Sequence, residues 1–176
     1  MSEKMSGEKR RKFIVNQLKK TKKAYTGRQL AEMTNVSRQV IVTDIALLRT
    51  ADEPIIATNR GYIYLQEDEQ ETFKKVVACQ HRPEDTAEEL NIIVDNGVKV
   101  LNVIVEHPIY GEMTGSLQIE SRFDVKQFIE ALHEEQSTLL SVLTDGIHLH
   151  TLEADKEEKL EAAIQALRHA GYLYEA

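Results

Sequence analysis

The sequence has 176 residues, 41% of them hydrophobic, so it can form one larger domain or two small ones. It contains no run of about 18 apolar residues and no leader with a basic start and an apolar middle, so we expect a cytoplasmic protein without a membrane span. Cys79 is the only cysteine, which excludes an internal disulfide and a cysteine-rich zinc or iron–sulfur site.

The net charge of −7 hides two oppositely charged parts. Residues 1–65 carry 13 Lys and Arg against 6 Asp and Glu, whereas residues 66–176 carry 9 against 23 and hold all six histidines. A cationic segment gains affinity for a phosphate backbone through counterion release, and an anionic segment is repelled by it. The division favours a nucleic-acid-binding part followed by a part with another role, although solvated charged faces on both parts would give the same counts.

The basic part has the pattern of three short helices. Apolar spacing predicts these helices over residues 8–18, 26–33 and 37–49. The first of them begins with a basic run at 9–12. Thr26 and Ser37 can cap the second and third helices, and Asn35 tolerates the left-handed conformation of a turn between them. We expect these two helices to pack through Leu30, Ala31, Met33, Val36, Val40, Ile45 and Leu48.

A hairpin follows the helices. Residues 54–65 alternate around a turn at Asn59-Arg60-Gly61, which predicts a two-stranded wing. Polar side chains at the start of the third helix lie where a recognition helix meets bases and phosphates. The candidate DNA contacts are Ser37, Arg38, Gln39 and Thr43 on this helix, Thr26 at the start of the preceding helix and Arg60 at the tip of the wing.

The order of helices and hairpin resembles the winged helix-turn-helix of the biotin-operon repressor class across residues 7–65. A small helical module that binds protein is the alternative. The basic charge and the polar start of the third helix favour DNA.

Strand and helix patterns alternate in the acidic part, after a polar hinge at 66–72 with a boundary near Asp68. The patterns predict strands over 73–79, 98–105 and 115–119, a hairpin over 139–152 turning at Asp145-Gly146, and helices over 83–93, 125–132 and 156–170. We therefore expect an α+β fold overall: a winged helix-turn-helix over residues 1–66, then a sensor domain over 67–176 with a mixed sheet packed by helices.

Histidines in the acidic part have the spacing of metal ligands. His148 and His150 alternate on a predicted strand, so both rings point to one face. His81 ends another strand, and Glu89 lies eight residues on in the next helix, where a strand-to-helix return can bring both to one place. A hydrogen-bonded surface pair explains His148 and His150 equally well, and Glu88 is as polar as Glu89.

The remaining polar candidates have weaker patterns. Arg82 and His107 are candidate contacts for a small anionic ligand, and a turn histidine satisfied by backbone is the alternative for His107. His133 and His169 end helices, where a cation meets the helix dipole favourably, so we interpret both as structural. Cys79 faces the same way as His81 but fits a small core residue.

The segments around these histidines resemble the three-histidine (3H) domain, and nearly the full chain resembles the niacin-responsive repressors of Gram-positive bacteria. The resemblance lies in His81 with Glu89-Leu90, in His107-Pro108-Ile109-Tyr110-Gly111 and in Gly146-Ile147-His148-Leu149-His150-Thr151. It implies a dimeric repressor of NAD synthesis and niacin uptake genes, with nicotinic acid as co-repressor. It also implies a divalent metal (zinc, nickel, iron, cobalt or manganese) on His81, Glu89, His148 and His150.

Two other functions stay open at this point. In the first, the metal itself is the signal, and the protein is a metal-responsive repressor. A metal hydrolase is the third interpretation, but the sequence has no helical His-Glu-x-x-His motif and a hydrolase gives no reason for a basic winged module, so we do not expect an enzyme.

Overall fold

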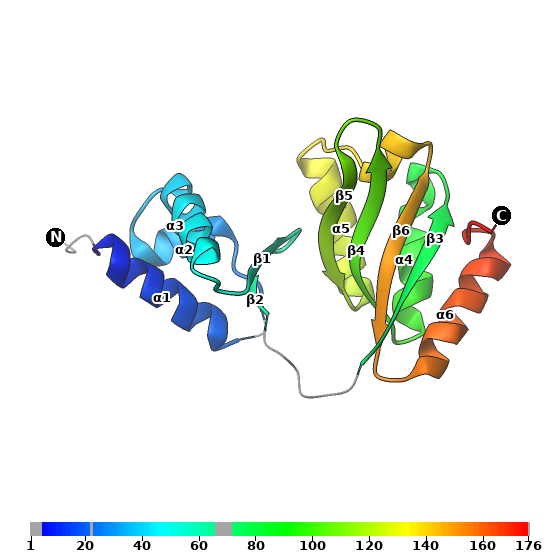
Figure 1. Ribbon diagram of the computed structural model, residues 1–176, viewed down its shortest axis with the longest axis horizontal. Helices are drawn as coiled ribbons and strands as arrows, with labels where there is room; N and C mark the ends of the chain where they lie inside the picture. The colour runs from blue at the N-terminus through cyan, green and yellow to red at the C-terminus, as the bar shows by residue number, and fades with distance from the viewer. Residues whose placement is uncertain (1–4, 22, 66–71, 176) are drawn as a thin grey trace. The chain divides into compact units, whose positions relative to one another are not determined.

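The computed structural model describes residues 5–21, 23–65 and 72–175. The chain separates into two compact units, Met1–Asp68 and Glu69–Ala176 (Figure 1). The boundary expected near Asp68 lies outside the described residues. Within the described ranges, no helix is both long and apolar enough to cross a membrane.

The N-terminal unit consists of three helices and a hairpin, as the sequence predicts. Its elements are α1 (Gly7–Lys19), α2 (Gly27–Thr34), α3 (Arg38–Thr50), β1 (Ile55–Thr58) and β2 (Gly61–Tyr64), with the two strands antiparallel. Thr26 caps α2 in a reciprocal capping box with Gln29, and the Ser37 side chain accepts from the backbone of Val40. Asn35 ends α2 in the left-handed conformation, with φ 51°. The turn between α2 and α3 therefore forms as expected.

The core of this unit joins all three helices to the first strand. Its buried apolar residues are Ile14, Val15, Leu18, Leu30, Ala31, Ile41, Ile45, Leu48 and Ile55. The expectation that Met33 faces inward is wrong, because its side chain is 43% exposed. Thr34 takes the inward position one residue on, and its hydroxyl donates to the Leu30 carbonyl.

A buried ion pair ties α1 to α3. Arg10 donates to Asp44 through Nε at 2.5 Å and through Nη2 at 3.3 Å, and Arg11 reaches the same carboxylate at 3.3 Å. The Arg10 and Asp44 side chains are only 11% and 3% exposed. Two residues of the basic run thus hold the helices together, and the sequence patterns did not indicate this role.

The wing packs back against the start of α2. Tyr25 and Tyr62 form an isolated antiparallel bridge. Gly61 has φ 120°, and a Cβ there would lie 2.4 Å from the Tyr25 carbonyl oxygen. Only glycine fits this contact without displacing backbone.

The C-terminal unit is a four-stranded sheet with helices on one face (Figure 1). Its elements are β3 (Phe73–Gln80), η1 (Pro83–Asp85), α4 (Thr86–Asp95), β4 (Lys99–His107), β5 (Gly111–Ile119), α5 (Arg122–Glu134), η2 (Leu140–Thr144), β6 (Ile147–Ala154) and α6 (Glu157–Ala170). The strand order is β3-β6-β4-β5. The α+β class is confirmed, but the expected mixed sheet is wrong: every described neighbour pair is antiparallel. The last strand inserts between β3 and β4, running opposite to both.

The expected hairpin over 139–152 is also wrong. Leu140–Thr144 form a 3₁₀ turn and only Ile147–Ala154 form a strand. Asp145 and Gly146 both have positive φ, as expected for a turn. Gly146 lies against the backbone carbonyl of His81, and a Cβ atom at this position would lie only 2.4 Å from that oxygen. The strand therefore pairs with β3 and β4 rather than with the residues before the turn.

The three helices α4, α5 and α6 bury one face of the sheet. The core beneath them includes Val77, Cys79, Leu90, Ile93, Val100, Ile119, Leu152, Leu160 and Leu167. A bulge at Leu101 shifts the register of β4 between Val100 and Asn102, so alternation resumes one residue later.

Candidate metal centre and DNA-binding surface

Four predicted residues meet beneath the start of α4. His148 and His150 project from β6 toward the helices, His81 follows β3, which pairs with β6, and Glu89 descends from α4. The Glu89 carboxylate lies 2.8 Å from Nε2 of His81, 3.3 Å from Nε2 of His148 and 3.4 Å from Nε2 of His150. All four side chains are at most 3% exposed.

Backbone carbonyls orient the three imidazole rings. Nδ1 of His81 lies 2.8 Å from the Arg82 carbonyl, Nδ1 of His148 lies 2.9 Å from the Gly146 carbonyl, and Nδ1 of His150 lies 2.6 Å from the Asn102 carbonyl. A carbonyl oxygen only accepts, so each Nδ1 carries the hydrogen. In a neutral ring, Nε2 then carries a lone pair that is directed at the carboxylate, as in metal-binding histidines.

The charges of the cluster support one another. Burial by itself raises the pKa of Glu89, but the imidazoles of His150, His148 and His81 outweigh it and hold that pKa well below its usual value. Burial lowers the pKa of His150 and of His81, and contact with the Glu89 carboxylate more than reverses this, so both pKa values are raised. The cluster thus favours positive charge around one carboxylate.

The donor set fits a divalent transition metal. Nε2 of His150 is buried and has no hydrogen-bond partner among the described residues, although it lies 3.4 Å from the Glu89 carboxylate. An unprotonated Nε2 facing a carboxylate is repulsive unless a cation lies between them, and a metal ion satisfies all three rings without protonating them. Imidazole and carboxylate ligands suit zinc, iron, nickel, cobalt or manganese.

Two neighbours of the cluster were not assigned to it from sequence. Sγ of Cys79 and ligand atoms of Glu89 and His148 all lie within 4.8 Å of one another, so the buried thiol borders the site as well as the core. Burial raises the pKa of the Cys79 thiol, and the Glu89 carboxylate raises it further. The ring of Tyr172 lies edge-on to His81 at 5.6 Å between centroids. The two-residue spacing between Cys79 and His81 is the sequence pattern that could have indicated Cys79. No sequence pattern indicated Tyr172.

The two candidate effector contacts, Arg82 and His107, are not directed at the cluster of histidines and Glu89. The Arg82 side chain, 74% exposed, pairs with Glu84 and Asp85. Nδ1 of His107 accepts from the backbone N–H groups of Ile109 and Tyr110, which is the turn arrangement weighed above.

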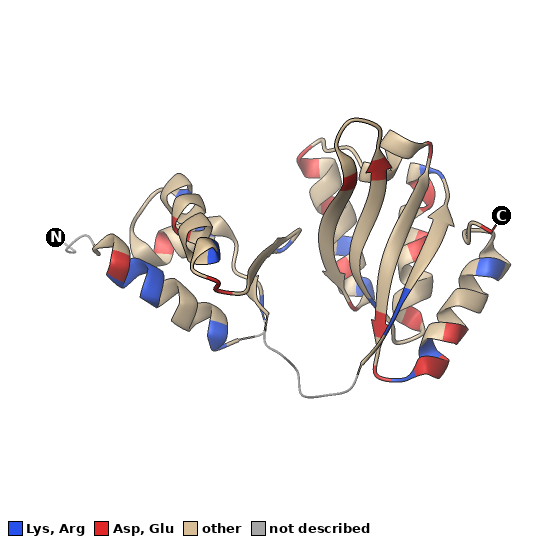
Figure 2. Cartoon of the chain, in the orientation of Figure 1, with Lys and Arg blue, Asp and Glu red and all other residues tan. Residues whose placement is uncertain are grey.

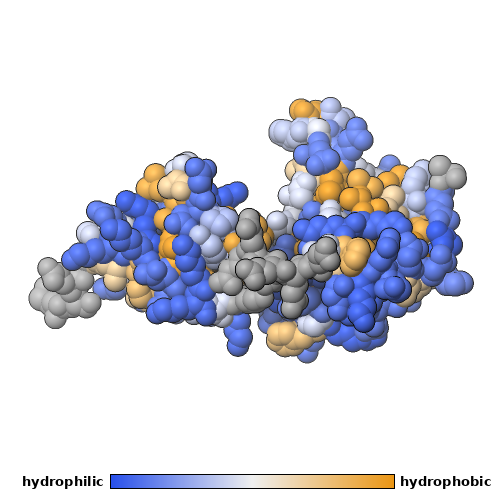
Figure 3. Space-filling view, turned by 60° about the horizontal axis from the view of Figure 1, so that its bottom comes forward, coloured by the Kyte–Doolittle hydropathy of each residue, from blue (hydrophilic) through white to orange (hydrophobic). Residues whose placement is uncertain are grey.

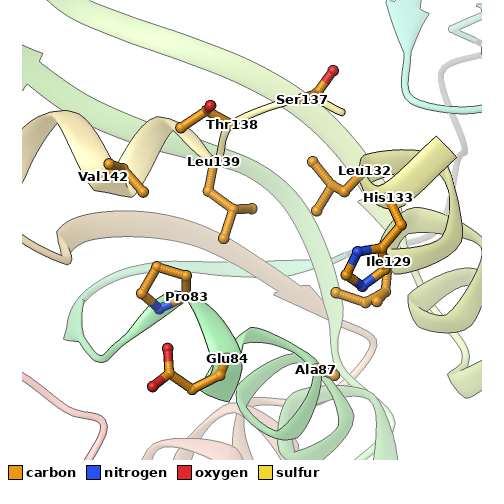
Figure 4. Close-up of a pocket in the computed structure, with 10 residues that line it drawn as sticks. All are labelled: Pro83, Glu84, Ala87, Ile129, Leu132, His133, Ser137, Thr138, Leu139 and Val142. Atoms are coloured by element: carbon orange, nitrogen blue, oxygen red, sulfur yellow. The ribbon is translucent and has the colours of Figure 1, made fainter. Parts of the chain in front are cut away.

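A cavity of about 610 Å³ opens beside the strand-to-helix return that carries His81 and Glu89 (Figure 4). Pro83 and Ala87 form one wall, and residues from the end of α5 through η2 form the other (Figure 4). Its lining is mostly apolar, with polar groups from Glu84, His133, Ser137 and Thr138. His133 therefore faces this cavity, while His169 is exposed on α6.

The predicted DNA contacts lie at the surface of the N-terminal unit. Arg38, Gln39 and Thr43 are exposed on α3, and Ser37 and Thr26 are exposed caps. Basic residues also lie along α1 and at the wing (Figure 2). Arg60 is half-buried rather than fully exposed, and its backbone N–H donates to the Thr58 hydroxyl.

Comparison with known proteins agrees with both units. The family described as "3H domain" matches residues 74–176, and the family described as "HTH domain" matches residues 10–63. The transcription repressor NadR of Bacillus subtilis (strain 168) is 46% identical over 172 residues, covering 97% of this chain and 96% of that protein. The probable transcription repressor NiaR of Thermotoga maritima is 41% identical over 168 residues, covering 96% and 95%. The chain belongs to the family of transcription repressors that join a helix-turn-helix domain to a 3H domain.

Proposed function

We propose that this protein is a DNA-binding repressor of genes for NAD synthesis and niacin uptake, with nicotinic acid as its co-repressor at or beside a divalent metal. The observation that carries the proposal is the convergence of three Nε2 atoms on the buried Glu89 carboxylate, in a chain similar over nearly its whole length to NadR and NiaR repressors. A member of this repressor family is a regulator and not an enzyme, as expected from sequence. A repressor acts where the DNA is, so we place it in the cytoplasm.

His81, Glu89, His148 and His150 would hold the metal. An ion with four protein ligands offers one or two further coordination positions to a pyridine nitrogen or a carboxylate. The chain's own contribution is to fix the rings: the carbonyls of Arg82, Gly146 and Asn102 keep each Nε2 free and aimed inward.

The effector site would extend from the metal into neighbouring space. The cavity beside η1 and α5 offers apolar walls for an aromatic ring, with His133 and two hydroxyls for a carboxylate. Arg82 and His107 remain candidate effector contacts through rearrangement of their side chains, because Arg82 directly follows His81 and His107 ends β4 at the same end of the sheet.

Repression would follow from a shift in the arrangement of a homodimer. The effector favours DNA binding only by its differential affinity for the two arrangements, and the favoured one must match the spacing of operator half-sites. On the DNA, the start of α3 would read bases through Ser37, Arg38, Gln39 and Thr43. Arg60 would contact phosphate or the minor groove, and Thr26 would add a contact at the start of α2.

Isothermal titration of the metal-loaded full-length protein with nicotinic acid tests the effector, with nicotinamide as the matched comparison. We expect one site per chain for nicotinic acid and tighter operator binding in a gel-shift titration when it is present. Operator binding that does not change with nicotinic acid, metal present, would exclude it as co-repressor.

The metal itself is the second candidate signal, because the cluster is complete without any effector. In that case, chelation weakens operator binding and added metal restores it with no nicotinic acid present. Under the first proposal, metal alone leaves operator affinity low.

A further inference from the structure

The four-stranded sheet of the C-terminal unit has a second face that its helices do not cover. We propose that this face is the interface with a second copy of the chain, packed so that the strands of the two sheets run in opposite directions. The inference deepens the proposed function, because it names the surface that forms the repressor dimer.

The strand register defines which residues share this face. Residues paired directly across strands point to the same side, and alternate residues point to opposite sides. Because His148, His150 and Leu152 point to the helices, their neighbours in β6 point away. The open face is thus formed by Lys74, Val76, Ala78, Gln80, Lys99, Asn102, Ile104, Glu106, Glu112, Thr114, Ser116, Ile147, Leu149, Thr151 and Glu153.

The centre of the open face is apolar. Val76 is 56% exposed, and Ala78, Ile104, Ile147 and Leu149 are half-buried with no described element of this unit packed over them. A group of apolar residues bordered by hydrophilic ones is visible on the C-terminal unit in Figure 3. Aliphatic residues in adjacent rows of a sheet face are the usual composition of a sheet that packs on another sheet.

The size of the open face is sufficient for a specific dimer. Four strands about 4.8 Å apart, each with eight or more residues of about 3.4 Å, present roughly 500 Å² per copy, so a pair buries roughly 1,000 Å². This is close to the lower limit for specific interfaces, about 1,000–1,200 Å².

The two ends of the open face differ in charge: one end row holds two lysines and one glutamate, net +1, and the other holds two glutamates, net −2. Lys74 and Lys99 flank Glu153 in one end row, and Lys74 reaches that carboxylate at 3.1 Å. Glu106 and Glu112 pair across β4 and β5 at the other end, and both are exposed. Figure 2 shows acidic residues at the upper ends of β4 and β5, and basic segments of β3 and β4 beside an acidic end of β6 at the lower end of the sheet.

These charges select one of two symmetric arrangements. A two-fold axis parallel to the strands would bring the acidic ends of the two sheets together, with Glu106 beside Glu106 of the partner subunit, which is repulsive. An axis perpendicular to the strands, lying between the sheets, places each strand over its own copy in the opposite direction, so Glu106 faces Lys99 of the partner subunit, both being on β4. Like charges placed across an interface oppose assembly, so the perpendicular axis is favoured.

A hollow at the acidic end fits the incoming Lys99 of the partner subunit. It has a volume of about 550 Å³ and is lined in part by Ile104, Glu106, Glu112 and Leu149. A lysine stem packs on aliphatic side chains while its ammonium group stays with carboxylates. Both requirements are met here.

The first test is the oligomeric state of full-length Val76→Glu, measured by sedimentation equilibrium. We expect a dimer for the unmodified protein and a dissociation constant raised by about tenfold or more in the variant, because a carboxylate is placed in the apolar centre. Phe123→Glu is the matched control: Phe123 is 66% exposed on α5, outside the open face and the cavity, and its substitution should leave the dimer unchanged.

The second test is a charge exchange that does not depend on the apolar centre. Lys99→Glu and Glu106→Lys should each weaken the dimer, and the double variant should restore it, because the exchanged ends again meet with opposite sign. Circular dichroism establishes that every variant is folded.

Each outcome decides between occupants. A dimer that survives Val76→Glu and both charge reversals refutes the open face as the interface while leaving the dimeric repressor intact. A protein that stays monomeric at all concentrations refutes both. A monomeric Val76→Cys variant whose new thiol resists a thiol reagent would show that the chain's own N-terminal unit, not a second copy, covers the face.

Discussion

At the scale of single residues, Glu89 organises the candidate metal centre. It is 1% exposed and within 3.4 Å of all three imidazoles, so it neutralises whatever positive charge the site holds. The carbonyls behind the rings fix which nitrogen faces it. Removing any one ring leaves the carboxylate and the other two rings without a complete ligand set.

Replacing one ring should therefore abolish tight metal binding. We expect His148→Ala to weaken metal affinity by about 100-fold or more, measured by competition with a chromophoric chelator. His169→Ala is the matched control, because His169 is exposed at the end of α6. Equal affinity in the two variants would contradict the assignment.

The pKa shifts predict opposite pH dependences with and without metal. The raised pKa values of His81 and His150 stabilise the metal-free protein below the ordinary value of 6.5, and this is lost as pH rises through the raised pKa values. The lowered pKa of Glu89 contributes stability above 4.5 that is lost as pH falls. The cluster thus stabilises the metal-free protein most between these two values.

Metal must displace the protons held by these histidines, so its affinity rises with pH. We expect thermal unfolding with a chelator to show falling stability from weakly acidic to alkaline pH, and added metal to increase stability most at the alkaline end. A metal affinity that is independent of pH would contradict proton displacement.

At the scale of elements, the two sides of α3 have different roles, one in packing and one at the surface. Its inner side carries Asp44, which holds Arg10 of α1, and its outer side presents Gln39 and Thr43. The inner side of α3 is therefore held in place by α1, and its outer side is exposed to solvent. Base recognition by a helix requires both.

Breaking the buried pair should destabilise the N-terminal unit. Asp44→Ala leaves the Arg10 charge buried without its partner and should cost about 3 kcal/mol in the free energy of unfolding, measured by urea denaturation. Glu32→Ala breaks the exposed pair with Arg28 and should change stability little. Similar losses in both would show that burial of the pair does not matter.

Changing the outer side should affect recognition without affecting stability. Gln39→Ala is expected to cost about 1–3 kcal/mol of discrimination for the operator over unrelated DNA. Gln165→Ala on the exposed side of α6 is the control. If Gln39→Ala weakened operator and unrelated DNA equally, Gln39 would contact backbone and not bases.

At the scale of the whole molecule, the two units have separate cores, and the candidate metal centre lies in one of them. A ligand that binds only the folded state stabilises the unit that holds it. The metal should therefore stabilise the two units unequally.

Calorimetry of the full-length protein tests this. Chelation should lower the unfolding temperature of the C-terminal unit and leave that of the N-terminal unit unchanged. Asp44→Ala identifies the N-terminal transition, because it should move that transition alone. A single transition shifted as a whole by chelation would mean that the units unfold together.

The sequence by itself determined the local features: the caps at Thr26 and Ser37, the left-handed turn at Asn35, the wing with its glycine, and the shared face of His148 and His150. Each depends on residues close in the chain, where sterics and strand or helix period decide the geometry. The spacing also selected His81 and Glu89, although Glu88 remained an equal alternative until α4 turned Glu89 toward the sheet.

Only the tertiary structure decided the non-local pairings. The insertion of β6 between β3 and β4 places His81 beside His148, removes the expected hairpin and makes the sheet wholly antiparallel. The Arg10–Asp44 pair spans 34 residues, and the uncovered sheet face exists only once the strands are ordered. Such contacts depend on which surfaces are left to bury after local structure has formed, and one-dimensional periodicity does not carry that information.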